Sequence, residues 1–341
     1  MSPSPASGSI WSPPPDRWST PEIVEDVIVA DELPIHRAGI SSVGADGEEV
    51  CGSAAEPNSS ALPRARFELL ERMSAFEALR TPRPFYDLLD VHGRVIATRP
   101  ANQVYPQSDD PARWRYARTN GIALHVDWTT ACRRALWELA ERDRVLRSWY
   151  GYGEVTPERL DLAQADRPRT RSYEWYAYSF PDRREGSFSQ DVEVVGVFAF
   201  PTRDERPFLL GFGARPDTRE ALGAAVGEAL QMLAFLWEEP ASGPSTEPSP
   251  EPTAMFHLDL LQTRRQQAQI RRWLEGAHLA YGASARPAGG AQVGFVDLTP
   301  DWLQDGLRVA KAICSDATPL VFGEAPFARH LPQELRVHPI P

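Results

Sequence analysis

Lysine is almost missing from this sequence of 341 residues and occurs once, at Lys311. A lysine that forms a Schiff base or cradles a phosphate is therefore excluded everywhere else. Any anion held by side chains must rely on arginine, whose planar guanidinium fork suits oxyanions. The formal net charge is −11. Because nonspecific nucleic-acid binders are basic, we expect no nucleic-acid partner.

Cysteine is also scarce, with residues at Cys51, Cys132 and Cys314. They are far apart and form no C-x-x-C pair, so neither a zinc ribbon nor a disulfide framework is supported. We interpret them as buried thiols of a protein in the reducing cytoplasm. No apolar stretch reaches the ~20 residues that span a bilayer, and the N-terminus lacks a basic start followed by an apolar run. We therefore expect a cytoplasmic location and no membrane partner.

The common nucleotide-binding and catalytic motifs are missing as well. The sequence contains no GxxxxGK[ST], HExxH or GxSxG motif and no kinase motif set. Gly151-Tyr-Gly153 and Gly211-Phe-Gly213 lack the third glycine of a dinucleotide fingerprint, and we interpret both as turns. A nucleotide, if one binds here, must be held in a less common way.

What the sequence does contain is a globular composition with 42% hydrophobic and 24% charged residues. Residues 1–20 are rich in Ser and Pro and are predicted to be disordered, and residues 239–253 to form a low-complexity linker or loop. By length, the chain forms roughly two ordinary domains or one large one, and residues 330–341 form a proline-containing tail.

Strand and helix patterns alternate irregularly along the chain. The predicted helices cover residues 62–79, 128–149, 217–238 and 256–278. The predicted strands cover residues 23–33, 122–126, 192–201, 207–214, 293–299 and 306–313, and residues 91–99 are predicted to form two short strands joined at His92-Gly93. Such a mixture indicates an α/β or α+β fold.

Three of the predicted helices each carry two oxygen-bearing side chains at a spacing of three residues, which places both on one helix face. The pairs are Glu68 and Glu71, Glu138 and Glu141, and Glu228 and Gln231. A single pair of this kind usually lies on a solvated face. Here, however, the neighbours on the same face are small or apolar, such as Ala75, Ala131 and Ala221.

Two carboxylates at this spacing repel each other, and partial burial adds to the cost. Such a pair persists if it is protonated, matched by arginine, or bound to a cation. Several pairs converging on one cavity would form an oxygen-rich cage suited to Mg²⁺ with a nucleotide's phosphates. Arg72 and Arg142 each follow the second glutamate and can meet phosphate or orient the carboxylates. Buried structural Glu–Arg pairs are the alternative.

Several segments resemble the YcaO-domain family, and they occur in the family's order from about residue 23 to the end. They are RFELLERMSAF (66–76), RTNGIALHVDWTTACRRALWELAERD (118–143), GFGARPDTREALGAAVGEALQML (211–233), VDLTPDWLQDGLRVAKAI (296–313), PLVFGEAPFARHLP (319–332) and HPIP (338–341). The resemblance implies an ATP- and Mg²⁺-dependent enzyme that acts on peptide backbone amides. It also implies an α/β fold in which glutamate-bearing helices surround Mg·ATP, so that residues 21–341 would form the YcaO domain.

The family's site residues carry over to matching positions of this sequence. The nucleotide would be bound by Glu68, Glu71, Arg72, Asn120, Glu138, Glu141, Arg142, Glu228, Gln231 and Arg329. The metal ions would be bound by Glu68, Glu71, Glu138, Glu141 and Glu228. Arg142 and the terminal carboxylate of Pro341 would be catalytic, the latter as a base delivered by the proline-containing tail.

The best-known members of the family are azoline-forming cyclodehydratases of ribosomally made peptides. The resemblance therefore implies a precursor peptide as substrate, often with a separate leader-binding partner protein, and a possible homodimer. Thioamide or macrocyclic amidine formation is an alternative within the family. A non-catalytic peptide-binding scaffold is a further alternative, since Ala65 stands where the first motif usually has Ser.

Overall fold

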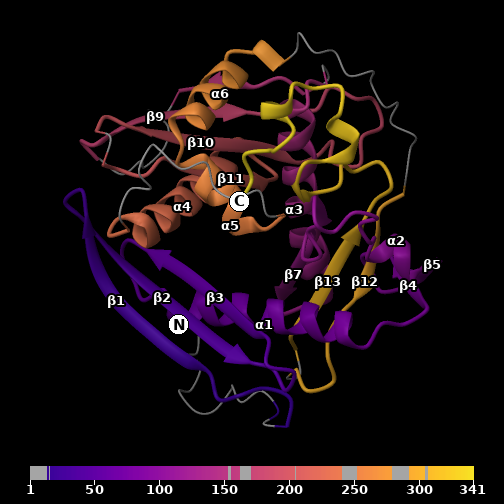
Figure 1. Cartoon of the computed structure of the whole chain (residues 1–341). Helices are drawn as coiled ribbons and strands as arrows, with labels where there is room; N and C mark the ends of the chain where they lie inside the picture. Colours follow the sequence, from indigo (N-terminus) through magenta and orange to yellow (C-terminus); the bar gives the residue numbers. More distant parts are fainter. Residues whose placement is uncertain are drawn as a thin grey trace.

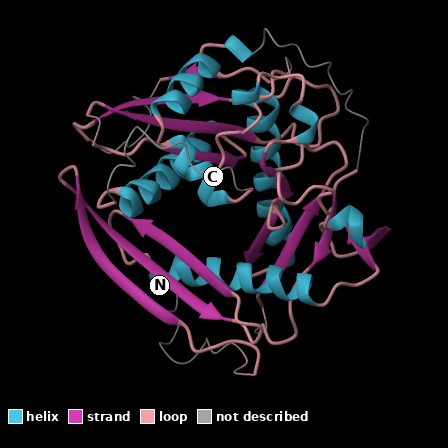
Figure 2. Cartoon of the chain, in the orientation of Figure 1, coloured by secondary structure: helices cyan, strands magenta, loops and turns pink. Residues whose placement is uncertain are grey.

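The computed structural model describes residues 14, 16–152, 155–161, 170–203, 205–239, 252–278, 292–303 and 306–341. Helices pack against several small sheets that surround the middle of the molecule (Figure 1, Figure 2). The strand pairs among these residues are all antiparallel. Of the two expected classes, the α+β arrangement is therefore the one formed.

The N-terminal sheet has the order β1-β2-β3 and carries helix α1 on one face. Its elements are β1 (Glu22–Ala30), β2 (Leu33–Val43), β3 (Glu49–Glu56) and α1 (Leu62–Arg80). At Gly52 on β3, an added Cβ would lie 2.2 Å from the backbone oxygen of Ala65 on α1. The absence of a side chain at Gly52 therefore lets the helix backbone approach the strand and sets the position of α1.

A five-stranded sheet with the order β5-β4-β12-β13-β7 lies beside α1 and α3. Its elements are β4 (Phe85–Leu89), β5 (Val95–Pro100), β7 (Ile122–His125), β12 (Gly294–Asp297) and β13 (Arg308–Ile313), with α2 (Ala101–Val104) and α3 (Trp128–Trp149). The carboxylate of Asp127 accepts a hydrogen bond from the Thr130 N–H and caps the start of α3. The bounds predicted for this helix are confirmed.

The third sheet has the order β11-β10-β9-β8 and is covered by α4. Its elements are β8 (Glu158–Leu160), β9 (Tyr173–Ser179), β10 (Glu193–Pro201), β11 (Leu209–Arg215) and α4 (Thr218–Leu236). The interpretation of Gly211-Phe-Gly213 as a turn is wrong, because both glycines lie within β11. An added Cβ at Gly213 would lie 2.2 Å from the backbone oxygen of Ala221, so the glycines allow α4 to approach closely.

The C-terminal third of the chain folds back over α3 and the third sheet. Its elements are α5 (Ala254–Leu261), α6 (Arg264–Leu274), β14 (Val321–Gly323) and the 3-10 helices η3 (Pro326–Ala328) and η4 (Gln333–Leu335). Strand β14 pairs with β6 (Trp114–Tyr116), which comes much earlier in the chain. The prediction of a single helix at 256–278 is wrong, because two helices, α5 and α6, occupy this segment. The Thr263 hydroxyl accepts from the Gln266 N–H and donates to the Leu260 carbonyl, which ends one helix and caps the next.

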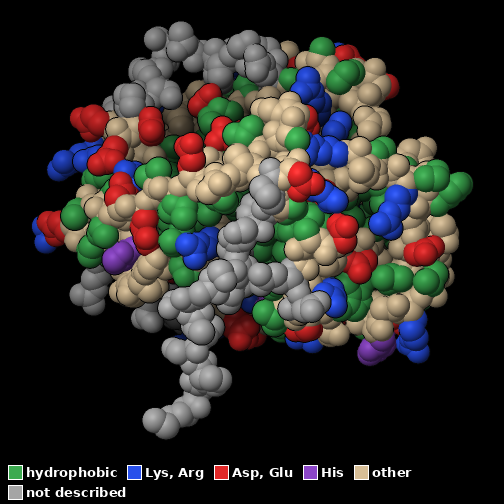
Figure 3. Space-filling model, turned by 90° about the horizontal axis from the view of Figure 1, so that it is seen from below, with side chains coloured by type: hydrophobic (Ala, Val, Ile, Leu, Met, Phe, Trp, Pro, Cys, Tyr) green, Lys and Arg blue, Asp and Glu red, His purple; other side chains and the backbone are tan. Residues whose placement is uncertain are grey.

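The predicted disordered and linker segments fall mostly outside the described residues, which exclude 1–13, 15 and 240–251. Trp18, however, is buried, and its Nε1 donates to Glu77 at 2.8 Å. This part of the N-terminal segment packs against α1, whereas the sequence predicts disorder for residues 1–20. Among the described helices, none is long and apolar enough to cross a bilayer. On the face seen from below, basic and acidic side chains are interspersed (Figure 3).

Replacing Gly213 with alanine should destabilise the protein, because the new Cβ would collide with helix backbone that cannot move aside easily. We expect a loss of about 1–3 kcal/mol in the free energy of unfolding, as for other overpacked sites. Gly223→Ala in α4 is the matched control, since its Cβ would meet nothing within 4 Å, and it should leave stability unchanged or raised. Urea unfolding of the two variants measures the difference, and equal stabilities would contradict the proposed packing role of Gly213.

Candidate active site

The two glutamates of α1 are each held by the backbone of a different sheet. Oε2 of Glu68 accepts a hydrogen bond from the Ser53 N–H of β3 at 2.9 Å. Oε2 of Glu71 accepts one from the Leu124 N–H of β7, also at 2.9 Å. The predicted spacing of three residues therefore places both carboxylates on the face of α1 that joins the N-terminal sheet to the five-stranded sheet.

Arg72 lies at the edge of this face. Its Nη2 is 2.5 Å from Oε1 of Glu68, and its Nη1 donates to the Cys51 carbonyl at 2.9 Å. The side chain is about half exposed. Of the two roles predicted for Arg72, the structure shows the orientation of a carboxylate.

The glutamates of α3 face the same region. Glu138 accepts a backbone hydrogen bond from Gly121, in the turn before β7. Glu141 is 7% exposed, and its Oε1 lies 3.5 Å from Nη1 of Arg142. Nη2 of Arg142 lies 3.9 Å from Oε1 of Glu228. Arg142 thus links the second motif to the third.

The third motif closes the arrangement from α4. Oε2 of Glu228 accepts from the Phe212 N–H of β11. The Gln231 amide donates to the Ser53 carbonyl at 3.2 Å, so Ser53 contacts the first motif through its N–H and the third through its C=O. Figure 1 shows α1, α3 and α4 on three sides of the middle of the molecule. The structure therefore brings together the three motifs that the sequence predicts to converge.

Burial and the charges of neighbouring carboxylates raise the pKa values of Glu71, Glu138 and Glu141. Burial, followed by the negative charge of Glu138, raises the pKa of Glu71 to about 8. Burial is also the main cause that raises the pKa of Glu141 to about 8, and Glu228 and Glu138 add to it. The pKa of Glu138 is raised by burial too. In the absence of a bound cation, the group therefore contains more carboxyls than nearby positive charge can neutralise.

Two polar atoms at the edge of the group are buried and lack a protein hydrogen-bond partner among the described residues: Nε of Arg142 and Oδ1 of Asn120. Buried polar atoms without partners are rare in folded proteins, and one explanation is an absent ligand. Asn120 lines a cavity of about 120 Å³. We infer that these atoms are available to a bound molecule.

Lys311 is a site residue whose role sequence reasoning missed. It is 5% exposed on β13, and its ammonium donates to the carbonyls of Arg118 and Asn120 at 3.0 and 2.7 Å. Its charge also acts on Glu138. The single lysine of the chain thus holds the loop that carries Asn120, and its rarity in the sequence was the signal that could have identified it.

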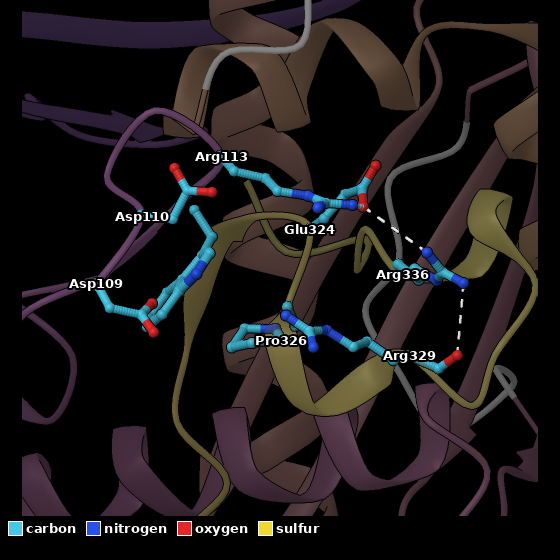
Figure 4. Close-up of a pocket in the computed structure, with 9 residues that line it drawn as sticks. Asp109, Asp110, Arg113, Glu324, Pro326, Arg329 and Arg336 are labelled. Atoms are coloured by element: carbon cyan, nitrogen blue, oxygen red, sulfur yellow. Dashed lines mark hydrogen bonds and ion pairs between the residues drawn. The ribbon is translucent and has the colours of Figure 1, made fainter.

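Arg329 lies apart from this group. Its exposed side chain lines a separate cavity of about 200 Å³ together with Arg113 and Arg336, and both of these pair with Glu324, at 2.8 and 3.9 Å (Figure 4). No carboxylate of the three motifs lines this cavity. The nucleotide-binding role of Arg329 therefore stays a prediction that no described contact supports.

The tail that ends at Pro341 packs into the molecule, and Ile340 is fully buried. The positive charge of Arg142 is close enough to contribute to a lowered pKa at His338. His338 of the tail therefore lies within electrostatic range of Arg142 in the second motif. The catalytic role of the Pro341 carboxylate stays a prediction.

The comparisons with known proteins give one family and one fold. The family described as YcaO cyclodehydratase, ATP- and Mg²⁺-binding, matches residues 48–317. No curated protein matches the chain. Among solved structures, YcaO from Methanopyrus kandleri bound with AMPPCP and Mg²⁺ has a TM-score of 0.57 and 20% sequence identity, over 94% of this chain and 89% of that one.

Two further structures are similar at lower identity. A heterocyclase in complex with substrate and cofactor is 15% identical with a TM-score of 0.55, over 89% of this chain and 50% of its own. The E. coli microcin synthetase McbBCD complex with pro-MccB17 bound contains a chain 11% identical with a TM-score of 0.56, over 86% of this chain and 88% of its own. These likenesses show the shared fold, while the family match covers most of the sequence. This chain belongs to the YcaO family of ATP- and Mg²⁺-binding cyclodehydratases.

Proposed function

We propose that the protein catalyses ATP-dependent cyclodehydration of Cys, Ser or Thr residues in a ribosomal precursor peptide, forming azolines. The observation that carries the proposal is the convergence of five glutamates from α1, α3 and α4: Glu71 interacts with Glu68 and Glu138, and Arg142 lies between Glu141 and Glu228. A strand backbone N–H donates to each of Glu68, Glu71 and Glu228. Such a preorganised group suits phosphoryl transfer, in which catalysis is mainly positioning and charge stabilisation.

The proposed reaction proceeds as follows. The side-chain oxygen or sulfur of the peptide forms a bond to the preceding carbonyl carbon and loses its proton. The former amide oxygen takes the terminal phosphoryl group of ATP. The C–O bond then breaks as phosphate leaves, and loss of the amide proton gives the C=N bond of the azoline. Phosphate is a far better leaving group than the amide oxygen, so ATP is consumed in each cycle.

The residues of the site fit Mg²⁺. Mg²⁺ prefers carboxylate oxygens and is usually bound by one or two carboxylates together with phosphate oxygens. Among the described residues, no three His, Cys, Asp or Glu side chains are placed so that they could ligate one ion by themselves. We propose Glu68, Glu71, Glu138, Glu141 and Glu228 as the residues that hold the metal ions. A bound Mg²⁺ would neutralise charge that develops on the phosphates.

The remaining residues are proposed to bind and orient the substrates. Within the described part of the chain, the buried Nε of Arg142 and Oδ1 of Asn120 have no hydrogen-bond partner. Arg142 would contact phosphate, and Asn120 would bind the nucleotide. Gln231 and Arg72 hold Ser53 and Glu68 in place. The carboxylate of Pro341 would accept a proton from the peptide.

The substrate class draws support from the relatives. One similar structure contains a heterocyclase with its substrate, and another contains pro-MccB17 bound to McbBCD. A peptide substrate is therefore proposed here as well. A separate leader-binding protein and a homodimer stay predictions.

Glu141→Gln should abolish peptide modification, since it removes the charge of a buried carboxylate at the centre of the group while keeping its shape. The assay incubates the enzyme with ATP, Mg²⁺ and a candidate precursor peptide rich in Cys, Ser or Thr. Mass spectrometry should show a loss of about 18 Da per ring with the wild type and no change with the variant.

Glu275→Gln, an exposed residue after α6, is the matched control and should retain activity. A gain of about 16 Da in place of the loss would indicate oxygen-to-sulfur exchange and would contradict azoline formation. Unchanged modification by Glu141→Gln would contradict an enzymatic role for the carboxylate group.

The stability of the metal-free protein should fall as pH rises. Glu71 and Glu141 have folded-state pKa values of about 8, above the ordinary value of 4.5. Their contribution to stability is therefore fully present below about pH 4.5 and is lost as pH rises through 8. Because Mg²⁺ favours the ionised carboxylates, it should raise the melting temperature more at pH 8.5 than at pH 6.

Thermal unfolding at both pH values, with and without Mg²⁺ and a nonhydrolysable ATP analogue, measures this difference. Glu71→Gln should reduce the pH dependence and the effect of Mg²⁺ together, because glutamine neither ionises nor binds the ion as a carboxylate does. Equal Mg²⁺ effects at the two pH values would contradict a metal-binding role for these carboxyls.

A further inference from the structure

The last residues of the chain are anchored in the core rather than lying on the surface. Val337, His338 and Ile340 are buried, and Ile340 belongs to the same hydrophobic cluster as Trp149. The Trp149 indole donates to the Leu335 carbonyl at 2.8 Å. Chain ends are usually poorly ordered unless specific contacts hold them. The contacts that hold this tail in the core can therefore be identified.

Two buried histidine side chains anchor the tail through hydrogen bonds. The rings of His257 on α5 and His338 in the tail have centroids 4.4 Å apart. The Gly323 N–H donates to Nε2 of His257 at 2.9 Å, so that nitrogen is an acceptor. Nδ1 of His257 therefore carries the proton and donates to the His338 carbonyl at 3.1 Å.

The second ring is assigned in the same way. The Ile340 N–H donates to Nδ1 of His338 at 3.2 Å. Nε2 of His338 then carries the proton and donates to the Val321 carbonyl at 2.7 Å. All four ring nitrogens of the pair thus form hydrogen bonds. In each ring, one nitrogen donates and the other accepts. Burial lowers the pKa of His257 to about 4 and that of His338 well below its usual value, which keeps both rings neutral.

These hydrogen bonds join three segments that are far apart in the sequence: α5, β14 and the tail. They fix the direction of the backbone at His338 and Ile340, immediately before the terminal residue. The guanidinium of Arg142 is the nearby charge that acts on His338. Arg142 belongs to the carboxylate group, at 3.5 Å from Glu141 and 3.9 Å from Glu228. The pair therefore fixes the tail within electrostatic range of the proposed active site.

We propose that His257 and His338 are positioning residues that hold the C-terminal tail against α5 and β14, so that the end of the chain stays beside Arg142 during catalysis. This inference rests on the proposed function, because it assigns a purpose to the position of the tail. Neither histidine contacts the reacting atoms in this role. Their contribution comes from a buried hydrogen-bond arrangement that a protonated or absent ring cannot make.

The test compares the wild type with His338→Phe and His257→Phe, which keep a ring of similar size and remove both nitrogens. Hydrogen exchange followed by mass spectrometry measures protection of the C-terminal peptide, residues 331–341. Peptide-dependent ATP consumption gives kcat and the KM for ATP. In both variants, exchange in this peptide should become faster, and kcat should fall roughly 10- to 100-fold, as expected for a displaced catalytic group. The KM for ATP should stay within about twofold of the wild type, since the carboxylate group is unaltered.

Two further variants separate positioning from general damage. His338→Asn retains an acceptor for the Ile340 N–H and should recover part of the protection and of kcat. His92→Phe, in the exposed turn before β5, is the matched control and should match the wild type in both measurements. If either phenylalanine variant fails to fold, as judged by exchange in α3 and α4, the asparagine variant decides the question.

Loss of tail protection with an unchanged kcat would overturn the proposal, as would unchanged protection in both phenylalanine variants. A fall in kcat accompanied by a similar rise in the KM for ATP would also overturn it, because the effect would then be a general loss of the site. The proposed function fails in a different way, with no peptide-dependent ATP consumption by the wild type. In that case the exchange data still show whether the histidines anchor the tail.

Discussion

The hydrogen bond from a strand N–H to a helix carboxylate is the interaction on which the rest of the site depends. Glu68, Glu71 and Glu228 each accept one, from β3, β7 and β11. Each bond fixes one oxygen of the carboxylate and thereby fixes the direction of the other. It also compensates in part for the cost of placing carboxylates in a buried environment. The sheets therefore act as the frame of the site, and the helices supply its chemistry.

Close approach between helix and strand makes these hydrogen bonds possible. Gly52 under α1 and Gly211 and Gly213 under α4 leave no room for a Cβ, so the helix backbone lies nearer to the strand than ordinary side chains would allow. The sequence contains these glycines but does not show what faces them. For this reason a strand segment such as Gly211-Phe-Gly213 could be mistaken for a turn, since glycine is enriched in turns and its packing role depends on a helix that comes later in the chain.

How much of the site could be predicted depends on whether its contacts join residues that are near or far apart in the sequence. The spacing within a helix is local, so the glutamate pairs at 68 and 71 and at 138 and 141 can be recognised from sequence, and the resemblance to a known family predicts that they surround one ligand. Partners such as the Ser53 and Leu124 backbone amides carry no side-chain signature and could not be found. Lys311 was noticed for its rarity, while its contacts with the loop at Asn120 come from β13, almost two hundred residues later. Arg329 had a family position but no periodicity, and the fold places it in another cavity.

The excess of carboxyls gives Arg142 a central electrostatic role in the site. Without a cation, Glu71 and Glu141 are stable mainly in their protonated forms, and Arg142 is the guanidinium that approaches both Glu141 and Glu228. The buried Nε of Arg142 has no described protein partner, so this side chain is not saturated by the carboxylates it neutralises. A ligand that brings both cations and anionic oxygens would satisfy the carboxyls and the arginine at the same time. Neither a metal ion alone nor a phosphate alone would do so, and this is the physical reason why the site fits a metal–nucleotide complex better than either component.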